Sequence, residues 1–479
     1  MTLLSATQTY QQAVALEQQG REGEALNRIE QFLQMRPAHG PAWNLAGRLS
    51  MKLGKMQKAM HAFRHCFTLL DRPKEALADL ANLYLRMGQA SQAARLLKPM
   101  KAEGMWDPRL VLRIARGLAD QQDTAGAMEV LQTGQMLSED PAIFQQPIEE
   151  LKKTRAKIAF FCGGDGTTFL KGIHHYLSKR HPVRFFEGSS PSEMAELMKW
   201  SDISWFEWAT NLAHIGSKLP KVCRTIVRLH RYEAYEPWPR EIQWHNVDLL
   251  ITVGNSYVIK ALEHWLPDIR QQVSIAKVPN GVDLGTISFQ NRPRGKNVAF
   301  VASLRMVKNP MLLLQCMKHL HQIDPEYQLF IAGESKELLM DHYFQHQVRV
   351  LGLEKIIHFD GWQGDVENWL SDKHYLVVTS VIESQGMGAL EAMAAGLKPV
   401  IHNFPGSEEI YGNKFLFNTP DEFCRHILSD DYNPCAYREF VEQRYPLSRS
   451  LLKINEIMSS FEQNPVTLSA RSPVETTGI

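Results

Sequence analysis

Small apolar residues recur at a fixed spacing along the first 150 residues. Alanine or glycine stands at four positions that are 34 residues apart, and an alanine follows each of them after twelve residues. These positions are Ala13, Gly47, Ala81 and Ala115, followed by Ala25, Ala59, Ala93 and Ala127. Helical patterns of apolar and polar residues run between them. Because antiparallel helices approach closely only where small side chains meet, the spacing predicts about four helix pairs over residues 1–150.

The pattern changes at residue 156, where short apolar runs begin to alternate with helical or polar segments. The first series of runs is 157–162, 183–188, 202–208, 224–230 and 247–254, and the second is 297–303, 328–333, 356–362, 374–380 and 398–403. Strands that are buried on both faces and alternate with helices indicate parallel α/β sheets. The pattern therefore predicts two doubly wound domains, at 156–285 and 286–465, which face a cleft.

The segment VPNGVDLGTISFQNRPRGK, at 278–296, separates the two series of strands. Its Asn-Gly step and its Pro, Arg and Gly residues are typical of a connection. Ligands bind parallel sheets at the carboxyl ends of the strands, so we expect the cleft between the domains to hold the site. The polar tail at 466–479 is predicted to be disordered.

Composition narrows the class of protein. The 479 residues are 44% hydrophobic and 22% charged with a formal net charge of +1, which is typical of a globular protein and argues against a nucleic-acid partner. No apolar run approaches the roughly 18 residues of a membrane helix, and the first residues lack a signal-peptide pattern, which favours a cytoplasmic protein. The six cysteines have no CxxC spacing, so we expect free thiols in a reducing compartment.

The string FFCGGDGTTFL, at 160–170, contains the Gly-Gly-Asp-Gly-Thr motif of NAD kinases and diacylglycerol kinases. The further motifs of those families are missing, and repeat helices stand where their earlier strands would be. We therefore reject the kinase interpretation. Gly163 and Gly164 are predicted to form a tight turn that lets a donor phosphate or an acceptor approach the backbone, with a plain strand–helix turn as the alternative.

The stretch TSVIESQGMGALEAMAAG, at 379–396, carries the strongest chemical signal. Glu383 and Glu391 are separated by seven residues, and a run of strong helix formers begins between them. We expect a diphosphate to bind the helix dipole and the backbone N–H groups at Gly386, Met387 and Gly388. Glu391 can accept hydrogen bonds from ribose hydroxyl groups, and Glu383 from the hydroxyl groups of a sugar. The alternative is a helix cap with a solvated glutamate.

This stretch resembles the E-x7-E motif of family 4 retaining glycosyltransferases, whose GT-B fold consists of two Rossmann-like domains. The interval and the closing Leu-Glu-Ala-Met-Ala-x-Gly are kept, whereas Ser384 replaces a usual glycine. The resemblance covers about 156–465 and implies sugar transfer from a nucleotide-sugar donor with retention of configuration. The helix pairs resemble the tetratricopeptide repeat, which implies that 1–150 binds a protein or peptide partner.

Further positions match the same family. The resemblance implies that Lys308 neutralises the phosphates of the donor. Ser303 stands where many members have arginine, and Arg305, two residues on, is the candidate substitute. The resemblance also gives His230, at a strand end, a contact with the donor sugar. We expect Glu233 to orient His230 or a hydroxyl group of the acceptor.

The sequence contains no Asp-x-Asp string, so we expect neither a metal ion nor another cofactor. Lys308, Arg305 and the helix N-terminus would stabilise the departing nucleoside diphosphate instead. Three functions stay open. The first is a glycosyltransferase whose repeats dock a protein acceptor or partner, as in protein glycosylation. The second is a glycosyltransferase that acts on a cell-envelope polysaccharide or a lipid-linked glycan, and the third is an inactive repeat scaffold with a degenerate transferase domain.

Overall fold

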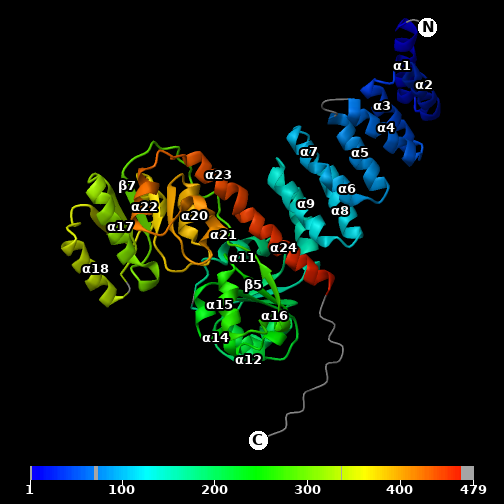
Figure 1. Cartoon of the computed structure of the whole chain (residues 1–479). Coiled ribbons are helices and arrows are strands. Elements are labelled where there is room, and N and C mark those ends of the chain that lie inside the picture. Colours follow the sequence, from blue (N-terminus) through cyan, green and yellow to red (C-terminus); the bar gives the residue numbers. More distant parts are fainter. Residues whose placement is uncertain (1–2, 70–73, 165, 336, 465–479) are drawn as a thin grey trace, which may run out of the picture. The chain divides into compact units, whose positions relative to one another are not determined.

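The computed structural model describes residues 3–69, 74–164, 166–335 and 337–464 (Figure 1). The chain forms two compact units, Met1–Arg155 and Ala156–Ile479. The tail predicted to be disordered, 466–479, lies outside the described residues. In the described part of the chain, no helix has the length and apolar character needed to cross a membrane.

The described residues of the first unit form helices joined by short turns. Its helices are α1 (Leu3–Gln18), α2 (Glu22–Met35), α3 (Gly40–Lys52), α4 (Met56–Leu69), α5 (Lys74–Arg86), α6 (Ala90–Arg95), α7 (Leu97–Ala102), α8 (Pro108–Asp120), α9 (Thr124–Leu137) and α10 (Gln145–Thr154), with a 3-10 turn at Pro141–Phe144. Helices α1 and α2, α3 and α4, α5 and α6, and α8 and α9 pack as pairs. This arrangement is the repeat array predicted from the spacing of small residues.

The eight small residues that repeat along the sequence are all buried in this unit. Gly47 shows why the site must be small: a Cβ atom there would lie 2.6 Å from a ring carbon of Phe63. The ring of Phe63 therefore fills the space that a side chain at residue 47 would need, so α3 and α4 pack closely only around glycine.

The turn between the two helices of each pair is also repeated. Gly20, Gly54 and Gly88 have φ angles of 70°, 73° and 67°. Gln122 stands at the fourth equivalent position and has a φ of 64°. Glycine adopts this left-handed conformation readily, whereas other residues adopt it at a cost. The fourth pair thus keeps the turn although its sequence has lost the glycine.

The second unit contains two sheets of six parallel strands. The first has the order β2-β1-β3-β4-β5-β6 and the second the order β12-β11-β10-β7-β8-β9. The strands are β1 (Ile158–Cys162), β2 (Val183–Phe185), β3 (Ile203–Glu207), β4 (Arg224–Leu229), β5 (Leu249–Thr252), β6 (Ser274–Lys277), β7 (Asn297–Val301), β8 (Gln328–Ala332), β9 (Ile357–Gly361), β10 (Tyr375–Val378), β11 (Lys398–His402) and β12 (Leu416–Phe417). The predicted fold class, with two sheets of GT-B type after a helical array, is confirmed.

The apolar runs predicted ten of these strands and missed β6 and β12. Both missed strands are at the edge of a sheet. Strand β6 is half exposed, and β12 contains two residues. The other two edge strands, β2 and β9, were predicted, so an edge position alone does not hide a strand. An edge strand need not be apolar on both faces, and β6 has no buried residue, whereas β12 is too short to form an apolar run.

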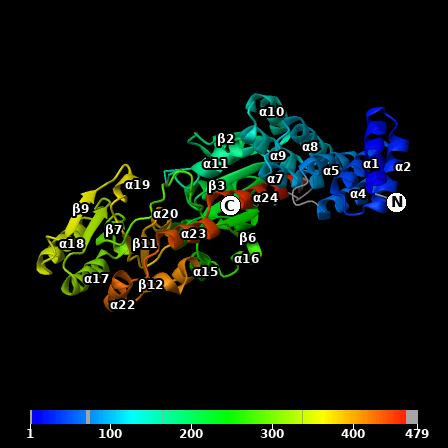
Figure 2. The same ribbon diagram turned by 90° about the horizontal axis from the view of Figure 1, so that it is seen from above.

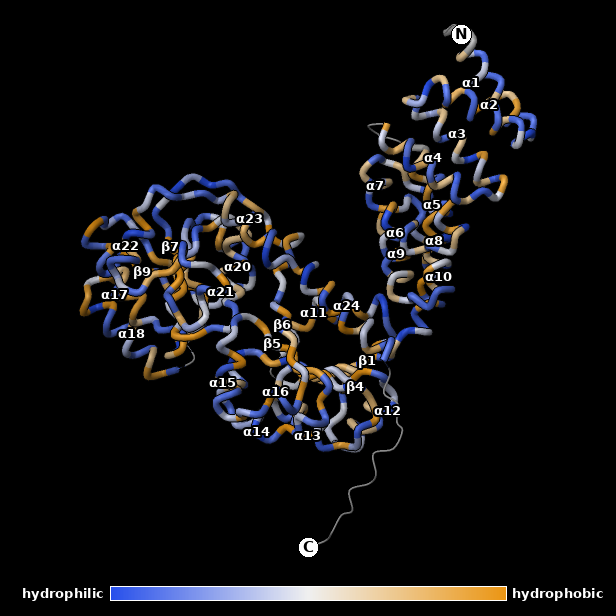
Figure 3. Tube along the Cα trace, turned by 45° about the vertical axis from the view of Figure 1, so that its right-hand side comes forward, coloured by the Kyte–Doolittle hydropathy of each residue, from blue (hydrophilic) through white to orange (hydrophobic). Residues whose placement is uncertain are grey.

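Helices cover both faces of each sheet (Figure 2). Around the first sheet they are α11 (Lys171–Ser178), α12 (Pro191–Trp200), α13 (Asn211–Lys218), α14 (Trp238–Glu241), α15 (Tyr257–Trp265) and α16 (Ile269–Gln272), with 3-10 turns at Tyr232–Tyr235 and Trp244–Asn246. Around the second they are α17 (Pro310–Ile323), α18 (Leu338–Val350), α19 (Val366–Trp369), α20 (Met387–Ala394), α21 (Ser407–Tyr411), α22 (Pro420–Leu428) and α23 (Pro434–Arg444), with 3-10 turns at Met306–Lys308 and Asn413–Phe415. Hydrophobic positions gather along the central strands (Figure 3).

The last helix, α24 (Leu447–Gln463), packs against the first sheet and beside α11. Its Ile454 and Met458 are buried with Phe160 of β1. The chain re-enters the first domain next to the point where it leaves, because Val282 and Pro446 form an isolated parallel bridge. The range predicted for the second domain, 286–465, therefore includes a helix that completes the core of the first domain.

Candidate active site

A cavity of about 270 Å³ lies where the carboxyl ends of the two sheets face each other. Its walls include residues that follow the ends of β3, β4, β7 and β10 directly. Six of the residues predicted to form the site line this cavity together: His230, Lys308, Glu383, Gly386, Met387 and Gly388.

Glu383 is held among polar and positively charged groups. Its Oε1 atom accepts a hydrogen bond from Ser380 Oγ at 2.9 Å and forms an ion pair with Lys308 Nζ. Its Oε2 atom lies 4.0 Å from Nε of Arg231. Thr379 Oγ1 donates to the backbone oxygen of Lys308 at 2.8 Å, which fixes the turn that carries the lysine. The carboxylate is therefore presented to the cavity between two cations.

The loop that carries Glu383 is held by the first domain. Asn255, after β5, donates from its backbone N–H to the oxygen of Ser384 and from Nδ2 to the oxygen of Glu383, both at 2.8 Å. Gly254 has a φ of 75°, and a Cβ atom there would lie 1.9 Å from the Ser384 oxygen. Only glycine allows this approach. The sequence analysis did not identify these two residues.

Gln385 connects the same loop to the segment between the domains. Its side chain accepts from the backbone N–H of Asn280 at 2.8 Å and donates to the backbone oxygen of Asn280 at 2.7 Å. Tyr411 Oη donates to the backbone oxygen of Gln385 at 2.7 Å. These contacts fix the loop just before Gly386, whose φ of 71° turns the chain into α20.

Helix α20 points its N-terminus at the cavity. It begins at Met387, and no side chain caps it. The first N–H groups of a helix have no partner within the helix, so Met387 and Gly388 offer donors to an anion. A Cβ atom at Gly388 would meet nothing within 4 Å, which leaves the backbone open on that side.

Glu391 lines an adjoining cavity of about 420 Å³ rather than the one that contains Glu383. Solvent reaches its side chain, yet the surrounding protein desolvates the carboxyl and raises its pKa above the ordinary value. Phe169, Asn280, Met387 and Gly388 belong to the walls of both cavities, which therefore adjoin each other.

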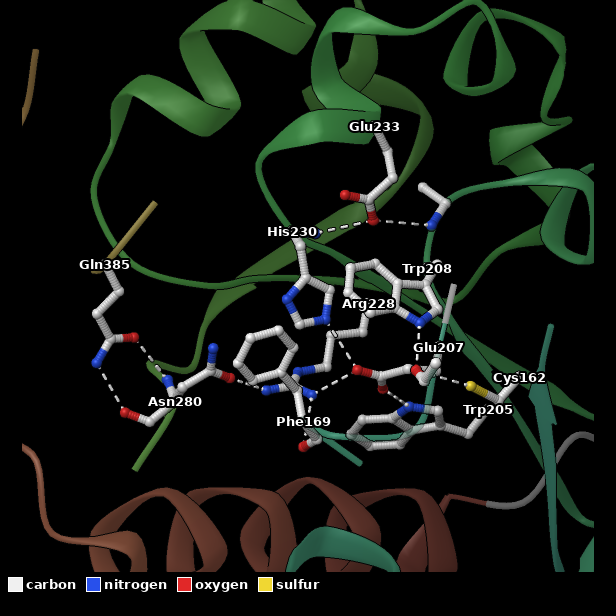
Figure 4. A network of polar contacts seen from close by, with 12 residues as sticks. Cys162, Phe169, Trp205, Glu207, Trp208, Arg228, His230, Glu233, Asn280 and Gln385 are labelled. Carbon is white, nitrogen blue, oxygen red and sulfur yellow. Dashed lines mark hydrogen bonds and ion pairs between the residues drawn. The ribbon is translucent and has the colours of Figure 1, made fainter. Parts of the chain in front are cut away.

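His230 follows β4 and is buried between two aromatic rings (Figure 4). The ring centroids of Trp208 and Phe169 lie 4.1 Å and 5.0 Å from its own. Its Nε2 atom lies 2.8 Å from Oε1 of Glu207. Burial lowers the pKa of the imidazole, and the Arg228 guanidinium also lowers it, against the opposing effect of Glu207.

Glu207 and Arg228 form a buried ion pair beside His230, with Arg228 Nη1 at 2.7 Å from Oε1 of Glu207. Arg228 Nη2 also donates to Oδ1 of Asn280. The sequence analysis missed this pair, although a signal existed. A glutamate and an arginine stand inside the runs 202–208 and 224–230, which were predicted to be buried on both faces. Charged residues are rarely buried unless they are paired.

Glu233 lies within the first domain and lines neither cavity. Its Oε1 atom accepts from the backbone N–H groups of His230 and Ala209, at 3.1 Å and 3.3 Å. Burial raises the pKa of this carboxyl to about 7. Glu233 thus holds the backbone of His230, and both roles predicted for it remain predictions.

Ser303 and Arg305, predicted to bind the donor, line neither cavity. They follow β7, but Val301 and Ala302 form the wall instead. Ser303 is half-buried and Arg305 is exposed to solvent. Among the residues that the structure describes, Lys308 and Arg231 are the cations that pair with Glu383.

Gly163 and Gly164 also lie outside both cavity walls. Neither has a positive φ, and a Cβ atom at Gly164 would meet nothing within 4 Å. The glycine that the turn requires is Gly166, which has a φ of 95° and accepts a hydrogen bond from Trp208 Nε1 at 2.9 Å. The structure therefore gives no steric reason for the first two glycines.

Among the described residues, no group of three or more His, Cys, Asp or Glu side chains could hold a metal ion. The prediction that the site uses no cofactor remains a prediction.

Two segments of the chain match known families, one in each of the two units of the structure. Residues 287–429 match the family described as glycosyl transferases group 1, and residues 40–69 match the tetratricopeptide repeat. The first match includes Lys308, Glu383 and α20, and the second includes α3 and α4. The predicted combination of a glycosyltransferase-like domain with these repeats is confirmed, whereas family 4 and the E-x7-E motif remain predictions.

Two curated relatives are glycosyltransferases. The UDP-Gal:alpha-D-GlcNAc-diphosphoundecaprenol alpha-1,3-galactosyltransferase of Escherichia coli is 26% identical over 190 residues, which are 37% of this chain and 46% of the relative. The tRNA-queuosine alpha-mannosyltransferase of Drosophila melanogaster is 29% identical over 139 residues, which are 29% of this chain and 35% of the relative. The chain thus spans less than half the length of either.

Solved structures share the fold of the second unit. HepE from Anabaena, crystallised with UDP, superimposes with a TM-score of 0.51 at 16% identity and covers 64% of this chain and 100% of its own. A glycosyltransferase from Rickettsia africae gives a TM-score of 0.51 at 13% identity, with coverage of 65% and 99%. At these identities the similarity concerns the fold.

Proposed function

We propose that the protein is a retaining glycosyltransferase that moves a sugar from a nucleotide-sugar donor to an acceptor. One observation carries the proposal: the Glu383–Lys308 pair and the N-terminus of α20 line one cavity between two parallel sheets. The match of 287–429 to glycosyl transferases group 1 supports it, because that segment contains all three features.

The donor is held by groups of different chemistry along the two adjoining cavities. The N–H groups of Met387 and Gly388 and the dipole of α20 bind the diphosphate. Glu391 accepts hydrogen bonds from the ribose in the larger cavity. Glu383 and His230 bind the transferred sugar in the smaller one.

The costly step is the departure of the nucleoside diphosphate, on which negative charge develops. Lys308 and the N-terminus of α20 face that charge, so they stabilise the transition state more than the ground state. Arg231 adds a second cation to the cavity wall. Because these groups are fixed before reaction, they provide the stabilisation for which other enzymes use a metal ion.

The first unit is proposed to dock a protein that is the acceptor or an assembly partner. A cavity of about 570 Å³ is lined by α2, α3 and α4. Trp43 and His61 lie in its wall with their rings 5.8 Å apart, and Lys58 and Glu30 form an exposed ion pair there. An aromatic surface with charged groups around it suits a peptide.

A glycan-linked lipid is the competing acceptor, because the E. coli relative acts on a diphosphoundecaprenol-linked sugar. The two alternatives differ in where the transferred sugar is found. Radiolabelled donor would be incubated with the full chain and an extract of its source cells, which is then separated into protein, lipid and polysaccharide fractions. Label in protein that falls in Trp43→Ala supports the first acceptor, whereas label in lipid or polysaccharide supports the second.

The activity itself is tested with a panel of nucleotide sugars and a measurement of released nucleoside diphosphate. We expect turnover with one donor and a product whose anomeric configuration, observed by NMR, matches that of the donor. Inversion would contradict the retaining mechanism. Absence of release with every donor would instead favour the inactive scaffold.

A further inference from the structure

Glu207, at the end of β3, lies behind the cavity and does not line it. Its carboxylate is fully enclosed by donors (Figure 4). Oε1 accepts from Arg228 Nη1 at 2.7 Å and lies 2.8 Å from His230 Nε2, and Oε2 accepts from Trp205 Nε1 at 2.8 Å. A buried charge with this many partners defines a single geometry, because any displaced donor would be left unsatisfied.

The protonation of this group follows from its neighbours. Burial alone would raise the pKa of Glu207, but Arg228, His230 and Trp205 together hold the pKa below its ordinary value. Glu207 is therefore ionised near neutral pH and can only accept hydrogen bonds. It follows that His230 Nε2 is the donor in the contact between them.

The same surroundings leave His230 with one proton. Its pKa is lowered by burial and by Arg228, so the ring is neutral near pH 7. With the proton on Nε2, the Nδ1 atom is a hydrogen-bond acceptor. Figure 4 shows this second nitrogen on the side of the ring that faces away from Glu207. Within the described residues no protein group bonds to it, and His230 lines the 270 Å³ cavity.

The ring is also prevented from turning over. Trp208 and Phe169 enclose its faces, and Glu233 holds its backbone N–H. Arg228 connects the network to Asn280, which is bonded in turn to Gln385 on the loop of Glu383. Hydrogen bonds thus connect the residues that orient His230, in the first domain, to the loop of Glu383 in the second domain.

We propose that Glu207 is a positioning residue that fixes the proton of His230 on Nε2 and so presents Nδ1 to the cavity as an acceptor for a sugar hydroxyl group. Glu207 touches no substrate and acts through His230. The identity of the hydroxyl group rests on the proposed function, whereas the location of the proton does not.

The proton is located by NMR on the full chain labelled with ¹⁵N-histidine. We expect a slowly exchanging N–H resonance of His230 that is bonded to Nε2, is absent in His230→Ala and shifts in Glu207→Gln. A proton on Nδ1 in the wild-type protein would overturn the proposal. This measurement needs no turnover, so it remains decisive even if no nucleotide sugar proves to be a donor.

A double-mutant cycle tests whether Glu207 acts through His230. Glu207→Met removes the acceptor of Nε2, and we expect it to lower kcat/KM by about 10- to 100-fold. Glu207→Gln keeps an oxygen for Nε2 and should recover most of the loss. In the His230→Ala background neither change should have a further effect beyond about twofold. Equal losses of the Met variant in both backgrounds would overturn the proposal. If the Met variant does not fold, the Glu207→Gln spectrum decides, because an unshifted Nε2–H resonance of His230 would also overturn it.

Discussion

The two sheets of the second unit have the same architecture but contribute different kinds of group to the cavity. The second sheet provides a partly accessible ion pair, Glu383 and Lys308, and the backbone of a helix N-terminus. The first sheet provides His230, whose position depends on the buried pair Glu207 and Arg228 behind it. The charged groups of the second sheet thus face a substrate. The charged groups of the first sheet are buried and orient His230.

This difference follows from where each pair is located. A buried ion pair adds little net stability, because the cost of desolvation offsets most of the attraction. Removing one partner is strongly destabilising, because the other charge is left buried and unpaired. The geometry of such a pair is therefore well defined. A pair at a cavity wall can exchange its partner for a ligand. Variants in the two sheets should consequently affect different measurements.

Arg228→Met in the first sheet should have the largest effect on folding. It leaves the Glu207 carboxylate buried without its cation, and we expect the free energy of unfolding to fall by about 3–5 kcal/mol in denaturant titrations. Arg270→Met, which removes the exposed partner of Glu263, is the control and should change it little. Equal effects would remove the distinction between the two kinds of pair.

Glu383→Ala, in the loop that follows β10 of the second sheet, should have the largest effect on turnover. Loss of the carboxylate that orients the sugar should lower kcat by about 100- to 1000-fold, as expected when a fixed charged contact at the reacting centre is removed. Glu439→Ala, at an exposed position on α23, is the matched control. The melting temperature should stay close to that of the wild type, and near-normal turnover would show that the site is elsewhere.

Glu233→Gln tests the raised pKa of a buried carboxyl beside the first sheet through the pH dependence of the free energy of unfolding. The pKa of about 7 in the folded protein exceeds the ordinary value of 4.5, so the folded state binds this proton more tightly than the unfolded chain does. Stability of the wild type therefore falls as pH rises from about 4.5 to about 7. The glutamine variant avoids this loss, and its advantage should grow by about 3 kcal/mol between pH 5 and pH 8. A difference independent of pH would contradict the raised pKa.

Lys308→Ala tests whether the second sheet stabilises the leaving group. We expect kcat to fall by about 100-fold, because the cation faces charge that develops in the transition state. Steady-state kinetics separate this role from simple binding. An increase in KM for the donor with kcat unchanged would mean that Lys308 binds the ground state and transition state equally.

Gly164→Ala should have the smallest effect, since a Cβ atom there would meet nothing within 4 Å. We expect kcat/KM within about twofold of the wild type. Gly254→Ala is the contrasting variant, because its methyl group would overlap the backbone oxygen of Ser384. A large loss of kcat/KM in Gly164→Ala would instead support the prediction that a phosphate approaches this turn.

The elements and part of the site were predictable because their signals are local. The period of 34 fixes which helix faces meet, and apolar runs identify every strand except the exposed β6 and the two-residue β12. Glu383 and Gly386 were predicted together because one loop carries them within a few residues, and the structure places both in the wall of one cavity.

The buried network was not predictable in the same way because it is assembled from distant segments. Glu207, Arg228, Asn280 and Gln385 come from two strands, a connection and a loop. Nothing in the spacing along the chain indicates that they meet. Gly163 shows the converse. A familiar motif suggested a ligand contact at this glycine, whereas the positive φ of the turn is at Gly166.

The bridge between Val282 and Pro446 brings the two connections between the domains of the second unit together at one place. The chain crosses between the two domains twice, yet both crossings pass through this one place, where Leu447 N–H donates to the Val282 oxygen and Val282 N–H to the Tyr445 oxygen, both at 2.8 Å. Two covalent links that run side by side act as a single pivot. Opening of the cleft would then be a rotation about this point, and it would draw Asn255 away from the loop of Glu383.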